Sequence, residues 1–177
     1  YERYSFEDAL DLLRPEYASA VIVESITKEN LESLLELDFE VAIVVLSGEI
    51  VLFTTGNEEE IGLTHPAYEL LKHAAFVSHT HVTEGSQLGP SSFDLAHALE
   101  SPLQEYVLTQ NGVYAYNQTG VQNNGETYAL AEYLAFLNQA KDSAQEKNHV
   151  KARGLLNAFI RQMDLYNEKS QVKRNLF

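Results

Sequence analysis

The sequence predicts an α/β fold in which a mixed central sheet is flanked by helices and followed by a C-terminal helical hairpin. Short β-branched runs such as residues 19–24 alternate with segments of helical periodicity such as residues 28–37. The apolar run over residues 39–48 is nearly unbroken, which is typical of a central strand covered on both faces. From about residue 126 onward, apolar residues recur at helical spacing, which indicates two amphipathic helices.

Local start and stop signals divide the first half of the chain into alternating elements. Ser5 begins a Ser-x-x-Asp capping pattern, and Pro15 stops the helix that follows it. Thr27 caps the next helix, and the turn sequence Ser47-Gly48 joins two strands directly, which predicts an antiparallel hairpin. The elements expected here are helices over residues 5–14 and 28–37 and strands over residues 19–24, 39–48 and 49–56.

The second half of the chain continues this alternation before it becomes helical. His65-Pro66 begins a helix, and the strand after that helix ends in a pair of histidines. Asn111-Gly112 supplies the two positive-φ positions of a tight turn, so the segment around it is predicted to be a hairpin. The elements expected here are helices over residues 67–74 and 91–99, a strand over residues 74–81 and a hairpin over residues 105–120.

The chain is expected to have three parts. They are an N-terminal helical lead over residues 1–18, a core over residues 19–121 and a C-terminal helical extension over residues 122–177. The extension places Phe136 and Phe159 on the apolar faces of its two helices. Two arrangements fit this pattern: the helices dock on the core, or they form a homodimer through these two faces.

Composition limits the kinds of site and partner. The 177 residues are enough to bury a core, and 45% of them are hydrophobic. The chain has no cysteine, so a zinc site must use histidine and carboxylate ligands, a chemistry that is more often catalytic than structural. A formal net charge of −14 argues against a nucleic-acid partner. No apolar run approaches the roughly 18 residues of a membrane span, which argues against a membrane partner and favours a cytoplasmic location.

The candidate site lies at the end of the strand over residues 74–81. Alternate side chains of a strand share a face, so His79 and His81 can point their rings at one place. A loop with glycine and proline lets the chain return, and Asp94 in the first turn of the next helix can supply an oxygen ligand. These three ligands leave the fourth position of a tetrahedral zinc ion open for water. Ser91-x-x-Asp94 is also a plain helix capping box, so this piece alone has a purely structural interpretation.

A zinc-bound water also needs a proton acceptor close to the ion but not bound to it. Glu40 begins the buried strand, and a carboxylate in that position requires a reason. Glu49, directly after the turn, is the competing candidate. Glu40 is preferred.

Glu40, His79-Thr80-His81 and Ser91-Ser92-Phe93-Asp94 occur in this order along the chain. The arrangement resembles the JAMM/MPN family of zinc metalloproteases, whose signature is a distant glutamate followed by His-x-His and Ser-x-x-Asp. The resemblance covers roughly residues 19–121 and leaves the C-terminal helices outside it. It implies the cytidine-deaminase-like core of that family, with helices around a mixed sheet.

The resemblance also implies an activity, which is hydrolysis of peptide or isopeptide bonds, commonly at ubiquitin-like C-terminal tails. By this analogy His79, His81 and Asp94 bind Zn²⁺, Glu40 is the general base and Ser91 helps to stabilise the tetrahedral oxyanion. The alternative is a catalytically inactive MPN-like module that binds protein partners through its helical extension. The position of Glu40 relative to the metal discriminates between these two functions.

The other histidines are expected to be packing or solvent residues. They are His65, His73 and His97, of which His97 lies one turn beyond Asp94 and can reach the rim of the site. Tyr114 and Tyr116 are candidates to line a substrate groove.

Overall fold

A computed structural model of the chain describes residues 2–16, 18–55, 69–82, 89–99, 103–143 and 149–176. For Ser92, Phe93, His97, His149 and residues 166–176 it describes only the backbone. The strands are β1 (Arg3–Tyr4), β2 (Ala18–Val23), β3 (Ala42–Leu46), β4 (Glu49–Thr55), β5 (Phe76–Thr80), β6 (Glu105–Thr109), β7 (Gly112–Asn117) and β8 (Gly120–Val121). The helices are α1 (Phe6–Leu12), α2 (Lys28–Leu35), α4 (Ser92–Ala98), the 3₁₀ turn η1 (Asn123–Gly125), α5 (Leu130–Ser143) and α6 (His149–Leu176).

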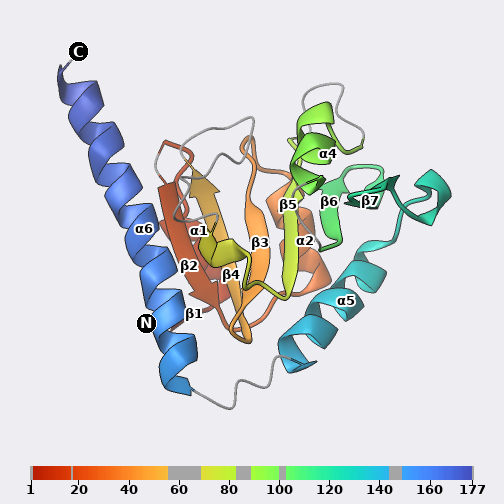
Figure 1. Ribbon diagram of the computed structural model, residues 1–177, viewed down its shortest axis with the longest axis horizontal. Helices are drawn as coiled ribbons and strands as arrows, with labels where there is room; N and C mark the ends of the chain where they lie inside the picture. The colour runs from red at the N-terminus through yellow and green to blue at the C-terminus, as the bar shows by residue number, and fades with distance from the viewer. Residues whose placement is uncertain are drawn as a thin grey trace.

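The strands form one open, mixed sheet in the order β1-β2-β4-β3-β5-β6-β7-β8 (Figure 1). β1 pairs with β2 in parallel, as does β5 with β6, and the other neighbours are antiparallel. Helices cover both faces of this sheet. The predicted α/β class, with a mixed central sheet flanked by helices, is confirmed.

The predicted hairpin of β3 and β4 lies in the middle of the sheet. Leu46 pairs with Glu49, so the loop consists of Ser47 and Gly48, with φ values of 55° and 76°. Two successive positive-φ residues give a turn whose twist matches that of the flanking strands. All five residues of β3 are buried, as expected for a strand covered on both faces.

Each face of the sheet has its own hydrophobic layer. On the first face, α1, α2 and α5 pack against odd-numbered residues of β3 such as Ile43. On the second face, α6 packs against even-numbered residues such as Ala42 and Val44. α4 covers another part of the second face, where Ala98 packs with Val107 and Tyr116. The candidate site lies on this second face.

The two C-terminal helices dock on opposite faces of the chain's own sheet, so the prediction that they form a helical hairpin is wrong. α6 runs alongside β2, and α5 lies toward β6 and β7 (Figure 1). Phe159 of α6 is fully buried, with its ring centroid 5.3 Å from that of Phe53. Phe136 of α5 stacks on Tyr106 at 5.8 Å. Both phenylalanine faces considered for a homodimer therefore pack against this chain.

Two helix starts follow the predicted capping patterns. Ser5 Oγ accepts a hydrogen bond from Asp8 N–H, and Thr27 forms a reciprocal capping box with Asn30. The predicted helix start at His65-Pro66 lies outside the described residues, although residues 69–71 are helical. Among the described residues, no helix combines the length and apolar character needed to cross a membrane.

The β6–β7 hairpin forms as predicted, but its turn differs. Thr109 pairs with Gly112, so the loop residues are Gln110 and Asn111. Only Gly112 has a positive φ, of 126°, and the prediction of a positive φ at Asn111 is wrong. The Thr109 hydroxyl holds this loop, because it accepts from Asn111 N–H at 3.2 Å and donates to Gly112 O at 2.8 Å.

Candidate metal centre

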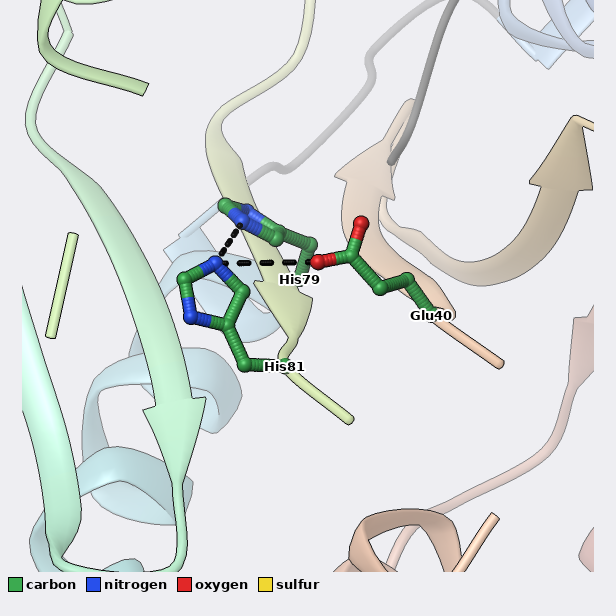
Figure 2. A group of neighbouring side chains, drawn as sticks. All are labelled: Glu40, His79 and His81. Carbon is green, nitrogen blue, oxygen red and sulfur yellow. Dashed lines mark hydrogen bonds and ion pairs between the residues drawn. The ribbon is translucent and has the colours of Figure 1, made fainter. Parts of the chain in front are cut away.

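Strand register places Glu40, His79 and His81 on one face of the sheet. β3 and β5 are antiparallel, and Ala42 lies opposite His79. Thr80 N–H donates to Val41 O at 2.9 Å, which continues this register and puts Glu40 opposite His81. The three side chains converge on the second face, as Figure 2 shows.

This cluster is almost completely buried. The exposed fractions are 3% for Glu40, 4% for His81 and 9% for His79. One ligand atom from each side chain lies within 4.8 Å of the other two, so the three residues are close enough to hold a metal ion.

Asp94 approaches the same point from the first turn of α4. Its Oδ2 lies 3.1 Å from His81 Nε2, and its Oδ1 lies 3.3 Å from His79 Nε2. The carboxylate is held by a capping box, because Ser91 N–H donates to Asp94 Oδ2 at 2.9 Å and Asp94 N–H donates to Ser91 Oγ at 3.0 Å. The capping and the site-forming interpretations of this motif are therefore compatible.

The electrostatic environment keeps Asp94 ionised. Burial alone raises the pKa of this carboxyl, but hydrogen bonds with His79 and His81 oppose the effect. The charge of His79 and the Ser91 N–H act in the same direction, and together they hold the pKa of Asp94 well below its usual range. An ionised carboxylate is the form that binds a cation.

The spacing of the ring nitrogens and the Asp94 oxygens suits tetrahedral coordination. With metal–ligand bonds of about 2.0–2.1 Å, two zinc ligands lie about 3.3 Å apart. His79 Nε2 and His81 Nε2 are 3.2 Å apart, and Asp94 oxygens lie at 3.1 and 3.3 Å from them. Glu40 Oε1 lies further out, 3.6 Å from His81 Nε2.

Hydrogen bonding among these side chains does not account for the cluster. His81 Nε2 has three polar neighbours, from His79, Asp94 and Glu40, yet an imidazole nitrogen carries at most one hydrogen. The carboxylates of the buried Glu40 and the half-buried Asp94 also favour a positive charge between them. A divalent cation at the common point satisfies both requirements, so the residues fit a metal.

Comparisons of the chain with protein-family models, curated proteins and solved structures give no match. The site therefore has to be interpreted from its own geometry.

Glu49, the competing candidate for the base, is far from the histidines. It lies opposite Leu46 at the other end of β3 and forms an ion pair with Arg3. Only Glu40 of these two glutamates reaches the cluster. His73 is exposed on the surface, while His65 and the side chain of His97 lie outside the described residues. Tyr116 is only 2% exposed and Tyr114 is half-buried, and their interpretation as groove residues stays a prediction.

Glu105 is a half-buried carboxyl near the site that the sequence did not indicate. It is the first residue of β6 and pairs with Tyr116 of β7, whose hydroxyl donates a hydrogen bond to it. Burial and the negative charge of Asp94 raise the pKa of Glu105 to about 7, and the Tyr116 hydrogen bond only partly offsets this. In the sequence, Tyr116 was the available hint of this contact, since it lies two positions beyond Tyr114 on the same strand face. Its contact with Glu105 could not be predicted, because it depends on the register between β6 and β7.

Glu105→Gln is expected to make the metal-free protein less sensitive to alkaline pH. The unfolded chain releases the Glu105 proton near its ordinary pKa of 4.5, whereas the folded protein keeps it up to about pH 7. The stability that Glu105 contributes below pH 4.5 is therefore lost as the pH rises through 7. Between pH 4.5 and 8, the free energy of unfolding of the variant should rise by on the order of 2–3 kcal/mol relative to that of the unaltered chain.

Urea unfolding with a chelator present, at both pH values, measures this difference. Glu126→Gln, at an exposed glutamate, is the control and should show no comparable gain. An equal stability difference at the two pH values for Glu105→Gln would contradict a raised pKa.

Proposed function

We propose that the protein is a zinc-dependent hydrolase that cleaves a peptide or isopeptide bond with water. The observation that carries this proposal is the convergence of two imidazole nitrogens and an Asp94 carboxylate at tetrahedral spacing. Imidazole ligands favour zinc over magnesium and calcium, which prefer oxygen ligands. Three protein ligands leave one coordination position for water, which is typical of catalytic sites.

The chain's own residues have distinct roles in this proposal. His79, His81 and Asp94 hold the ion, and the Ser91 capping box orients Asp94. Zinc bound there lowers the pKa of water toward neutrality and polarises the carbonyl group of the substrate. Ser91 Oγ accepts a hydrogen bond from Asp94 N–H, so its own proton can be donated to the developing oxyanion.

Glu40 is the proposed general base. Its Oε1 lies 3.6 Å from His81 Nε2, slightly more than the spacing of about 3.3 Å between two zinc ligands, and this supports a role as base rather than as ligand. From this position the carboxylate accepts the proton of the attacking water and passes it to the leaving amine.

The proposal includes membership of the JAMM/MPN family, with the cytidine-deaminase-like core over residues 19–121. Its support is the order Glu40, His79, His81, Ser91 and Asp94, together with the meeting of these residues at one end of a mixed sheet. The substrate is then a protein or peptide, including the tail of a ubiquitin-like protein.

One observation favours a second candidate, a catalytically inactive MPN-like interaction module with a structural ion. The exposed fractions of Glu40, His79 and His81 do not exceed 9%, which is low for groups that must meet a substrate. In this case the ion stabilises the fold and the surface binds partners.

Elemental analysis of protein purified without added metal tests the proposal first. We expect about one zinc ion per chain, and hydrolysis of at least one substrate in a panel of peptides and isopeptides. A chelator should stop the hydrolysis, and zinc should restore it. Zinc without hydrolysis would favour the interaction module, and no zinc even after its addition would overturn the proposal.

A further inference from the structure

The segment Ser78-His79-Thr80-His81 presents two kinds of side chain to two faces of the sheet. Successive residues of a strand point to opposite sides, so the histidines face the candidate metal centre and the two hydroxyl residues face away. Ser78 and Thr80 are each only 1% exposed. Buried hydroxyl groups of this kind are normally hydrogen-bonded, and their partners here are Val41, Ile43 and Tyr133.

Thr80 binds the backbone next to Glu40. Its N–H donates to Val41 O at 2.9 Å, and its Oγ1 accepts from Val41 N–H at 3.0 Å. In a regular antiparallel pair this second bond would go to the backbone carbonyl of the opposite residue. The Thr80 hydroxyl therefore holds the chain directly after Glu40, while its neighbours His79 and His81 form the other side of the cluster.

Ser78 makes a second connection between the same two segments. Its Oγ donates to Ile43 O at 2.7 Å and lies 2.6 Å from the Tyr133 hydroxyl. Because the one hydroxyl hydrogen of Ser78 goes to Ile43, Tyr133 is the donor in the second bond. Tyr133 is fully buried and belongs to α5, so this helix is connected to the residue that directly precedes His79.

We propose that Ser78, Thr80 and Tyr133 are positioning residues for the metal centre. They fix the segment of His79 and His81 against the segment of Glu40, and thereby hold the two histidine rings and this carboxylate in place. The inference rests on the proposed function and extends it, because it makes α5 part of the support of the site. Groups that orient metal ligands from behind commonly change metal affinity when they are removed.

Thr80→Val tests the proposal, because valine keeps the shape of threonine and removes the acceptor for Val41 N–H. We expect zinc affinity, measured by competition with a chromophoric chelator, to fall by about tenfold or more. The visible absorption of the cobalt-substituted protein, which reports ligand geometry, should change as well. Thr80→Ser keeps the hydroxyl and should retain both the affinity and the spectrum of the unaltered chain.

Tyr133→Phe provides an independent variant that leaves both strands unaltered. It should also weaken zinc binding by about tenfold, because Ser78 loses its donor. Thr27→Ala is the stability control. It also removes a hydroxyl hydrogen bond, but this bond caps α2, which follows the end of β2 that lies away from the histidines. This control should bind zinc like the unaltered chain even where its thermal stability is lower.

The outcomes separate this inference from the proposed function. If the unaltered chain binds zinc and Thr80→Val and Tyr133→Phe bind it equally well, with unchanged cobalt spectra, the positioning role is overturned while the metal site stands. If the unaltered chain binds no zinc, the proposed function is overturned and the positioning role with it.

Discussion

Loss of zinc binding is the expected result of replacing His81 by alanine. His81 Nε2 lies at the centre of the cluster, 3.2 Å from His79 Nε2, 3.1 Å from Asp94 and 3.6 Å from Glu40. Its removal leaves His79 and Asp94 without the third ligand that a catalytic zinc site needs. Removing a residue that only orients a metal ligand lowers metal affinity by up to about 100-fold. Because His81 is itself a proposed ligand, we expect its loss to lower zinc affinity by more than this.

Isothermal titration with zinc measures this loss, and thermal unfolding provides a second readout. Zinc should raise the melting temperature of the unaltered chain and leave that of His81→Ala unchanged, because a ligand stabilises only the state that binds it. The matched control is His73→Ala, since His73 is an exposed histidine on the same chain. Tight zinc binding by His81→Ala, or equal losses in both variants, would contradict the proposed ligand set.

Glu40→Gln is expected to retain zinc and to lose hydrolysis. Glutamine has the size of glutamate but cannot accept the proton of the attacking water, so kcat should fall by about 10²–10⁴-fold. Zinc affinity should change little, because the proposed ligands are His79, His81 and Asp94, and Glu40 is the proposed base. kcat is measured on the substrate from the panel that the unaltered chain cleaves, and zinc affinity is measured by isothermal titration.

Two further variants sharpen this experiment. Glu49→Gln changes the glutamate at the other end of β3 and should keep both zinc and activity. Asp94→Asn should lose zinc, since the ionised carboxylate is replaced by a neutral amide. If Glu40→Gln loses zinc as Asp94→Asn does, Glu40 is a metal ligand and its assignment as the base is wrong.

Features of the site that depend on neighbouring residues could be predicted from the sequence. The alternation of a strand puts His79 and His81 on one face, and the Ser91-x-x-Asp94 pattern forms the capping box that it suggests. The Ser47-Gly48 turn and the Thr27 cap also follow from local conformational preference. In each case the interacting groups are at most four residues apart, so the local sequence contains both partners.

Only the tertiary structure decided between Glu40 and Glu49. Both glutamates flank the same apolar strand, and the choice depends on how β3 is aligned with β5, whose residues follow more than 30 positions later. The surroundings of Glu105 and the hydroxyl contacts of Ser78 and Thr80 depend on strand register in the same way. By itself the sequence determined the fold class, two helix caps, the Ser47-Gly48 turn and the residue types of the candidate metal site. Strand register and helix docking decided which side chains meet. These contacts join segments that are far apart along the chain, so no local sequence pattern contains both partners.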